Sequence, residues 1–488
     1  MSSKLEDSSV TIRENRLHTI LAYHGDASEL NEKGKKKELR IGGYGYEQCG
    51  NCQEGCAGGE VYAILDAALV KHAPIGCYAT VSASCVSEKS TARARKKEDF
   101  HNKAICTNIL EEDTIYGGSE KLKTAIREAK RRYQPKVIFV TTSCASGIVG
   151  DDVQGIAKEM KEETGIPVVV ISCEGFKSRI WSTGFDAAFH GILQEVVKKP
   201  LRKQEDLVNI FNFEGTDSFT PLLSHLNLRV NYLPAQSTVE QLSQISEAAC
   251  TATICETLAT YVGEMLEKEY GVLQVKAAAP YGVAWTDNWL REVAKLTKKE
   301  SIVEQVIESE HKRIEKELQE LREELKGKRV YVFAGDAYAH NMANIATDLG
   351  MEVIGITTYH HDQNSDSKEI NTLDFLVKSI GNVPNYTVCN KQPYQVMKFL
   401  QKLKPDLLIV RHQALAVHGY KLGIPTIFEA DSNKSVGYDG IVELGRRIKR
   451  VFLTRKLINN IAENVSLPYK EWWMKESTDP FYFEGGKE

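Results

Sequence analysis

The sequence predicts an α/β fold with three doubly wound, Rossmann-like domains, each built on a parallel sheet. The chain has 488 residues, more than one hydrophobic core usually accommodates, so two or three domains are expected. Apolar β-branched runs alternate with amphipathic helical stretches in three successive segments, which is the pattern of βαβ units. The runs lack apolar–polar alternation, as expected for strands buried on both faces of a parallel sheet.

The predicted domain boundaries follow these segments. Residues 1–40 are polar and are expected to form an N-terminal arm. Residues 41–204 form domain I with the early cysteines, residues 205–327 form domain II with Cys255 and a linking helix, and residues 328–488 form domain III and a C-terminal tail.

Domain I begins with a predicted helix over Glu60–Lys71, where apolar residues recur on one face. Its further elements are a helix over Ser119–Arg132, a strand over Lys136–Cys144, a helix over Val153–Thr164 and a strand over Pro167–Cys173. Cys144 and Cys173 therefore both stand where a strand ends. Ligands of open α/β sheets bind beyond the carboxyl ends of the strands.

Domains II and III repeat the alternation of strands and helices. In domain II we expect strands over Leu207–Phe213 and Leu228–Leu233, a capping box at Ser237–Glu240, a long helical stretch over Ala249–Tyr270 and a charged helix over Ser301–Lys326. In domain III we expect strands over Arg329–Ala334, Glu352–Thr358, Asp406–Val410 and Pro425–Phe428, and a helix over Asn341–Leu349. Neither a dinucleotide fingerprint nor a phosphate-binding loop appears, so any nucleotide use is expected on a partner.

The composition is that of an ordinary globular protein, which we expect in the cytoplasm. Hydrophobic residues make up 42% and charged residues 26% of the chain. Its apolar runs fall short of the roughly 20 residues of a membrane span, and its N-terminus lacks the pattern of a signal peptide. A net charge of −4 gives no electrostatic reason to expect nucleic acid. We therefore expect neither a membrane nor a nucleic-acid partner.

The early cysteines are the strongest chemical feature of the sequence. Cys49, Cys52, Cys56 and Cys77 fall within 29 residues of a chain that holds 11 cysteines. Because cytoplasmic thiols stay reduced, this density favours metal binding over disulfides. A zinc site usually needs two paired cysteine motifs, and only Cys49–Cys52 forms such a pair. An iron–sulfur cluster held by thiolates from separate loops fits best, with zinc and purely structural cysteines as alternatives.

Four short motifs, in order and at comparable spacing, resemble one known family. They are His-Ala-Pro-Ile-Gly-Cys at 72–77, Asp-Thr-Ile-Tyr-Gly-Gly at 113–118, Cys-Ala-Ser-Gly-Ile-Val-Gly-Asp-Asp at 144–152 and Ser-Cys-Glu-Gly-Phe at 172–176. From about residue 45 to about 445 the chain resembles the α-type chain of nitrogenase component 1, whose relatives include cofactor-assembly scaffolds and nitrogenase-like reductases. The resemblance implies a component 1 type fold, a β-type chain in an α2β2 heterotetramer, and an ATP-hydrolysing iron protein as reductase.

The resemblance also implies two metal centres. The first is a P-cluster-like iron–sulfur cluster shared with the β chain, for which Cys77 and Cys144 match family ligands. Cys52, which stands 25 residues before Cys77, is the third expected ligand, with Cys56 and Cys49 as alternatives. The second is a large iron–sulfur cofactor of undetermined heterometal. Its cysteine ligand corresponds to Cys255, because the helix that follows ends like the matching family helix.

The cofactor pocket departs from that of nitrogenases. Where the family places its ligand histidine, this chain has Glu429–Asn433. The region that faces the reacting cluster edge corresponds to Trp181–Asp186, without the family's glutamine and histidine. His360 and His361 end a predicted strand in a segment that borders the cofactor, so they are candidate catalytic residues. These differences argue against ordinary dinitrogen fixation.

Two functions fit this pattern. The first is the α subunit of a nitrogenase-like oxidoreductase, in which low-potential electrons pass from the iron protein through the P-cluster-like centre to a second cofactor that reduces a small substrate. The second is a scaffold for nitrogenase cofactor assembly, since such scaffolds keep the cofactor cysteine and lack the ligand histidine. A tetrapyrrole reductase of the same superfamily is a third alternative, although its chain would not need Cys255.

Overall fold

The computed structural model describes residues 5, 19–20, 22–39, 52–178, 181–212, 215–362, 370–389, 396–411, 413–429 and 434–475. The chain divides into two compact units, the first formed by Met1–Arg16 and Asn51–Val275 and the second by Leu17–Gly50 and Lys276–Glu488. The first unit contains two four-stranded sheets, and the second contains a six-stranded sheet and a two-stranded one. The predicted α/β class with three Rossmann-like sheets is confirmed.

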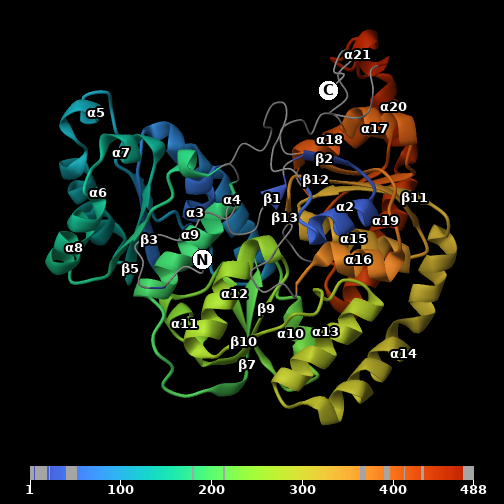
Figure 1. The fold of residues 1–488 in the computed structure, drawn as a ribbon, viewed down its shortest axis with the longest axis horizontal. Helices are drawn as coiled ribbons and strands as arrows, with labels where there is room; N and C mark the ends of the chain where they lie inside the picture. Colours follow the sequence, from blue (N-terminus) through green and yellow to red (C-terminus); the bar gives the residue numbers. More distant parts are fainter. Residues whose placement is uncertain are drawn as a thin grey trace. The chain divides into compact units, whose positions relative to one another are not determined.

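The first sheet of unit 1 has the strand order β4-β3-β5-β6, and all neighbouring strands are parallel. Its strands are β3 (Ala67–His72), β4 (Ala104–Cys106), β5 (Val137–Thr142) and β6 (Val168–Ile171). Helices α6 (Ser119–Tyr133) and α8 (Val153–Thr164) cover one face, and α3 (Gln53–Tyr62) and α9 (Thr183–Glu195) cover the other (Figure 1). Shorter elements are η1 (Ile75–Tyr78), α4 (Ala79–Ala94), α5 (Asp113–Tyr116), α7 (Cys144–Val149) and η2 (Gly175–Lys177).

This strand order determines where a ligand is expected. In chain order the strands run 2-1-3-4, so the connections leave β3 and β5 toward opposite faces of the sheet. The topological switch point therefore lies between β3 and β5, at their carboxyl ends.

The helix predicted over Glu60–Lys71 is wrong. Helix α3 ends at Tyr62 and strand β3 begins at Ala67, so the segment is divided between two elements. Ala68 and Val70 belong to the apolar cluster that includes residues of α6, whereas Leu69 faces α3. Because β3 is buried on both faces, its apolar residues lack a period of two and imitate helical spacing.

The second sheet of unit 1 repeats the same topology, with the order β10-β9-β7-β8 and parallel pairing throughout. Its strands are β7 (Gln204–Asn212), β8 (Arg229–Pro234), β9 (Ala248–Thr253) and β10 (Leu273–Gln274). Its helices are α10 (Phe219–Ser224), α11 (Val239–Ser243), η3 (Ile245–Glu247) and α12 (Glu256–Tyr270). The switch point of this sheet lies between β7 and β9.

Two predictions in this region need correction. The long helical stretch over Ala249–Tyr270 is strand β9 followed by helix α12, since β9 is another strand without alternation. The capping box that opens α11 is formed by Thr238 and Gln241, one residue later than predicted. The Thr238 hydroxyl accepts the Gln241 backbone N–H at 3.2 Å, whereas the Ser237 hydroxyl donates to the Pro234 carbonyl at 2.6 Å.

Unit 2 is built on a sheet with the order β16-β15-β11-β12-β14-β2. Its strands are β11 (Arg329–Ala334), β12 (Glu352–Thr358), β14 (Tyr386–Cys389), β15 (Leu407–Val410), β16 (Thr426–Phe428) and the antiparallel edge strand β2 (Ala22–Gly25). Among the five parallel strands the order is 3-2-1-4-5 from β14 to β16, so the switch point lies between β11 and β15. A short antiparallel pair joins β1 (Thr19–Ile20) to β13 (His361–Asp362).

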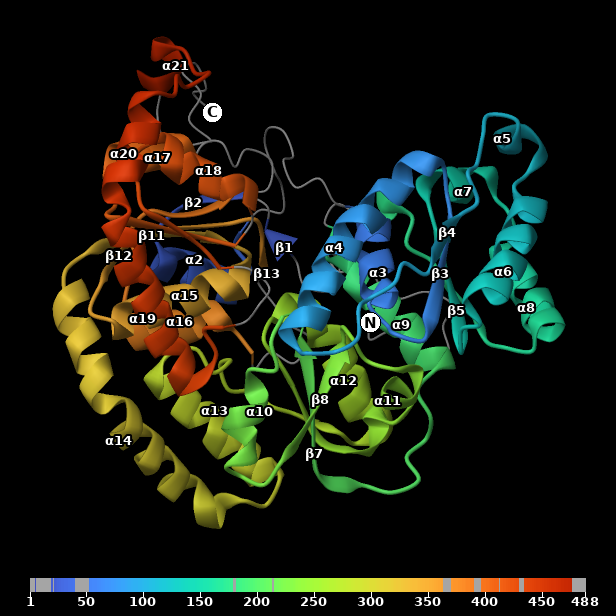
Figure 2. The ribbon, with the colours of Figure 1, turned by 180° about the vertical axis from the view of Figure 1, so that it is seen from behind.

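Helices cover both faces of the large sheet (Figure 2). Helices α15 (Asp336–Asp348), α16 (Thr372–Ile380) and α19 (Gly437–Leu453) lie on one side, and α17 (Val396–Leu403) and α18 (Gln413–Lys421) lie on the other. The remaining helices are α2 (Ala27–Lys35), α13 (Val283–Leu296), α14 (Glu300–Leu325), α20 (Arg455–Glu463) and α21 (Glu471–Lys475). None of the helices in the described ranges is long and apolar enough to cross a membrane.

Two segments differ from the predicted boundaries. Residues 22–39, assigned to an arm, instead supply β2 and α2 to unit 2, because β14 offers β2 an open strand edge. Residues 276–327, assigned to domain II, also belong to unit 2. There the charged helix α14 packs on α19, and the Glu317–Arg446 and Glu324–Lys449 ion pairs join the two helices.

Candidate functional site

Each of the two strands at the first switch point is followed by a cysteine. Cys77 lies in η1, in the loop after β3, and Cys144 opens α7 directly after β5. Cys52 is the N-cap of α3, where its sulfur accepts the backbone N–H of Gly55 at 3.4 Å. The three predicted cluster ligands therefore come from three separate elements of one unit.

Gly175 in η2 reveals how close two of these thiols are. A Cβ atom added to Gly175 would lie 3.4 Å from the Cys144 sulfur and 3.6 Å from the Cys52 sulfur. Cys52 and Cys144 are both exposed, so the two sulfur atoms flank one accessible space beside the glycine. Thiolates from separate loops that face one space are the donors that an iron–sulfur cluster requires. The residues present thus fit the group that the sequence predicts.

Cys77 lies within electrostatic reach of the same group. Burial raises the pKa of the Cys77 thiol above its ordinary value, and the nearby Glu54 carboxylate and the Cys52 and Cys106 thiols add to this effect. The Lys71 ammonium opposes them. Cys77 is half-buried, less accessible than Cys52 and Cys144. Over the part of the chain that the structure describes, no three Cys, His, Asp or Glu side chains surround one point as around a single metal ion.

His72 connects the sequence motifs on which the family resemblance rests. Its Nε2 lies 2.9 Å from Oδ2 of Asp151, whose other oxygen accepts the backbone N–H of Gly118 at 2.9 Å. The Ser143 hydroxyl donates to the His72 carbonyl at 2.9 Å. Burial lowers the pKa of His72 although Asp151 opposes this shift, so the imidazole is neutral near pH 7. These contacts hold the loops that carry Cys77 and Cys144 against each other.

A buried ion pair lies behind the cysteines, and the sequence analysis did not identify it. The Lys71 ammonium lies 3.0 Å from the Glu54 carboxylate, and their side chains are only 1% and 4% exposed. Lys71 also donates to the Cys77 carbonyl at 3.0 Å and to the Thr80 hydroxyl at 2.8 Å, and the Thr141 hydroxyl donates to Glu54 at 2.9 Å. The sequence feature that could have indicated this ion pair was the lysine inside the run Ala-Ala-Leu-Val-Lys-His. Because that run is predicted as a helix, the lysine is not recognised as a charge inside a buried strand.

The two alternative ligands have different positions. Cys56 is buried in α3, and a Cβ atom on Gly184 of α9 would lie 2.7 Å from its Cβ. Cys56 therefore lies at the contact between α3 and α9. Cys49 lies outside the described residues.

Cys255 occupies the corresponding position at the second switch point. It follows β9 and is the N-cap of α12, with 8% of its surface exposed. The Thr253 hydroxyl accepts the Cys255 backbone N–H at 3.1 Å and donates to its carbonyl at 2.8 Å, which holds the turn between strand and helix. Cys250 is completely buried within β9, so it packs in the sheet.

His360 and His361 are buried in unit 2, next to a polar network beyond the carboxyl ends of β11 and β12. His361 Nδ1 lies 3.1 Å from Asp336, and its Nε2 would lie 3.6 Å from a Cβ on Gly34 of α2. His340 Nε2 lies 2.6 Å from the Tyr386 hydroxyl, and burial lowers the pKa of His340 to about 4. Burial alone would raise the pKa of Asp336, but the histidines outweigh it and lower that pKa. A catalytic role of the histidine pair stays a prediction.

Glu429, the first residue of the segment that takes the place of the family's ligand histidine, is held in an ion pair. Its carboxylate accepts Arg447 Nη1 at 2.6 Å and the Ser435 hydroxyl at 2.7 Å, and the residue is 2% exposed. Residues 430–433 lie outside the described residues.

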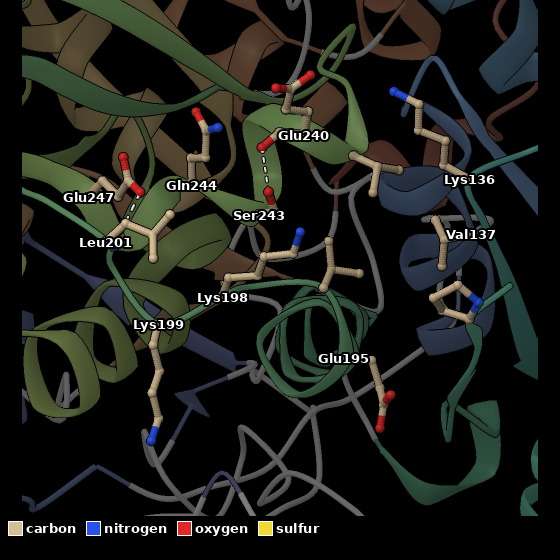
Figure 3. A pocket seen from close by; sticks show the side chains of 13 residues that line it. Lys136, Val137, Glu195, Lys198, Lys199, Leu201, Glu240, Ser243, Gln244 and Glu247 are labelled. Carbon is tan, nitrogen blue, oxygen red and sulfur yellow. Dashed lines mark hydrogen bonds between the residues drawn. The ribbon is translucent and has the colours of Figure 1, made fainter.

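A pocket of about 550 Å³ lies at the opposite end of the first sheet (Figure 3). Lys136 and Val137 border it where β5 begins, and Lys198, Lys199 and Glu240 line it from the other side. The described residues around this pocket include no cysteine. The pocket is therefore separate from the thiol site at the carboxyl ends of the strands.

The fold and the thiol site together define a class: an α/β protein with exposed thiols beside the switch point of a parallel sheet. Residues 52–453 match the family model of the nitrogenase component 1 type oxidoreductases. The chain is 30% identical over 398 residues to the nitrogenase iron-molybdenum cofactor biosynthesis protein NifE of Clostridium pasteurianum, covering 79% of this chain and 83% of that protein. The chain belongs to the nitrogenase component 1 type oxidoreductase family.

Two further comparisons agree. The chain is 30% identical over 315 residues to the nitrogenase molybdenum-iron protein alpha chain of Methanosarcina barkeri, and this match spans 61% of the chain and 58% of that relative's length. The solved structure of nitrogenase Cp1 at pH 5 superposes with a TM-score of 0.67 at 24% identity, covering 88% of this chain and 94% of that one. This likeness confirms the fold.

Proposed function

We propose that this chain is the α-type subunit of a nitrogenase-like reductase. Low-potential electrons come from an ATP-hydrolysing iron protein and pass through a P-cluster-like iron–sulfur cluster. Cys255 would hold a second iron–sulfur cofactor, which would supply the chemistry for reducing a small substrate other than dinitrogen.

One observation carries the proposal, namely the two exposed thiols that flank the open side of Gly175. Cys52, Cys77 and Cys144 hold the cluster, which supplies one-electron chemistry at a low, tunable potential when bound. Cys52 is preferred over Cys56 because Cys56 is buried toward α9. Cys49 remains a further alternative.

The surroundings of the thiols support a β-type partner chain. Ile75, Ile148 and Phe176 are 61%, 78% and 56% exposed, and each lies within four residues of Cys77, Cys144 or Gly175. Exposed apolar side chains that form one patch mark a protein interface. The β-type chain covers them, completes the cluster and forms an α2β2 assembly.

Cys255 holds the second cofactor, whose heterometal is open. Its place after β9 supports this role, because it is the N-cap residue at a sheet switch point. The segment Glu429–Asn433 contains no histidine, which supports a substrate other than dinitrogen. Glu429 itself is ion-paired with Arg447. His360 and His361 are the candidate groups for proton transfer.

Anaerobic co-purification with the partner chain, metal analysis and turnover with the cognate iron protein test the proposal. Cys255→Ala should lose only part of the iron, because Cys52, Cys77 and Cys144 hold a separate cluster. Cys250→Ala, the matched control, should retain all of it. Unchanged iron in Cys255→Ala would refute the second site.

Cofactor assembly is the second candidate function. It is favoured by Cys255 combined with the ion-paired Glu429, since a cofactor held by one protein ligand can leave. The 30% identity to NifE also supports it. Transfer of a cluster from this chain to an acceptor protein, without substrate reduction, would establish the scaffold. ATP-dependent substrate reduction with the cofactor retained would exclude it.

A further inference from the structure

The Lys71–Glu54 ion pair is in an unusual place for a charged pair. Lys71 stands in the central strand β3, opposite Cys106 of β4 and Thr141 of β5, and the other residues of β3 are buried too. Removing two ions from water costs several kcal/mol each, and their attraction often only offsets this cost. The pair is therefore a poor device for stability alone.

Each ion of the pair belongs to, or donates a hydrogen bond to, a segment that carries a predicted cluster ligand. Glu54 lies in the first turn of α3, two residues after Cys52. Lys71 donates to the backbone carbonyl of Cys77 itself and to Thr80 just beyond it. The 3.0 Å contact between the ions thus fixes the Cys52 end of α3 relative to the Cys77 loop.

Both charges also lie close to the expected ligands. Lys71 donates to the Cys77 carbonyl at 3.0 Å, and Glu54 stands in the first turn of the helix that Cys52 caps. Both ions are therefore close enough to act on a charge at this site. In a buried environment such interactions are much stronger than in water.

We propose that Lys71 and Glu54 form a positioning pair that sets the Cys77 loop against Cys52 and fixes the reduction potential of the cluster. This inference rests on the cluster site of the proposed function. Each electron added to a cluster brings one negative charge, which Lys71 favours and Glu54 disfavours. Net charge and surrounding dipoles are the factors by which a protein tunes iron–sulfur potentials.

Redox titration followed by electron paramagnetic resonance tests the pair in the chain purified anaerobically with its partner. Lys71→Gln should lower the midpoint potential and Glu54→Gln should raise it, because the two variants remove opposite charges. The neutral pair Lys71→Gln/Glu54→Gln should fall between them. Lys136→Gln, which removes a lysine at the opposite end of the same sheet (Figure 3), should leave the potential unchanged.

If Lys71→Gln alone loses its iron, the double variant still tests the proposal, because it contains no unpaired buried charge. The midpoint potential of the double variant must then be lower than that of Glu54→Gln alone. Shifts in the same direction, or no shift, would overturn the proposal, whereas loss of iron from a folded double variant would support the positioning of the two ligands by the pair. A wild-type preparation without any redox-active iron would instead refute the proposed function.

Discussion

Replacing Gly175 by alanine tests whether the space between Cys52 and Cys144 is the cluster site. The added methyl group would lie 3.3 Å from Cys52 Cβ, 3.4 Å from the Cys144 sulfur and 3.6 Å from the Cys52 sulfur. Gly175 is not among the glycines with positive φ, so alanine can adopt its backbone conformation. The perturbation is therefore confined to the space that both thiols face.

The expected effect on stability is small and the effect on iron is large. The 3.3 Å contact requires a movement of a few tenths of an ångström, and the contacts of 3.4 and 3.6 Å are ordinary van der Waals distances. Alanine also reduces the entropy of the unfolded chain, which contributes about 0.4–1 kcal/mol in the opposite direction. The unfolding temperature should thus change by no more than about 2–4 °C. Occupied space beside two ligands should lower cluster affinity by roughly 10–100-fold, as for other disturbed metal surroundings.

Iron per chain, measured after anaerobic reconstitution, and thermal unfolding by circular dichroism provide the two readouts. Gly191→Ala is the matched control, because its methyl group would lie 3.3 Å from side-chain atoms of Ile171 and Val169, an equal crowding in the apolar core. It should retain its iron. Full iron in Gly175→Ala would refute the placement of the cluster. Equal loss in both variants would show that packing, and not the thiol space, controls iron binding.

The remaining predictions concern packing, pH and the partner surface. Gly184→Ala should destabilise the first unit by about 1–3 kcal/mol in thermal unfolding, because its methyl group would lie 2.2 Å from the Gln53 carbonyl oxygen; an unchanged midpoint would contradict this. Burial lowers the pKa of His340 in the folded state to about 4, compared with 6.5 in the unfolded chain. Neutral His340 therefore contributes fully to the stability of unit 2 above pH 6.5. This contribution is lost, by up to ~3 kcal/mol, as the pH falls to about 4. Urea unfolding of wild type and His340→Gln across this range should show the loss only in wild type. Ile148→Ser should weaken co-purification with the β-type chain. Leu201→Ser, at a residue that is 95% exposed elsewhere in unit 1, should leave co-purification unchanged. Equal recovery of the two variants would show that Ile148 is not part of the interface.

Local patterns predicted most of the individual elements. Strand β11 occupies the predicted residues Arg329–Ala334, and helix α8 occupies Val153–Thr164 as expected. The two wrong assignments of a strand to a helix share one cause. Strands β3 and β9 are covered on both faces, so their sequences contain no alternation, and each was merged with a neighbouring helix.

Local sequence patterns predict the α/β class, the number of parallel sheets and the position of Cys77 and Cys144 near strand ends, because these features depend on residues close together in the chain. The strand order that places those ends at a switch point is visible only in the folded chain. The tertiary structure also decided that Gly175 lies between Cys52 and Cys144, and that Lys71 meets Glu54 inside the fold. The physical reason is that strand order and side-chain convergence arise from contacts between distant segments, which leave no trace in local periodicity.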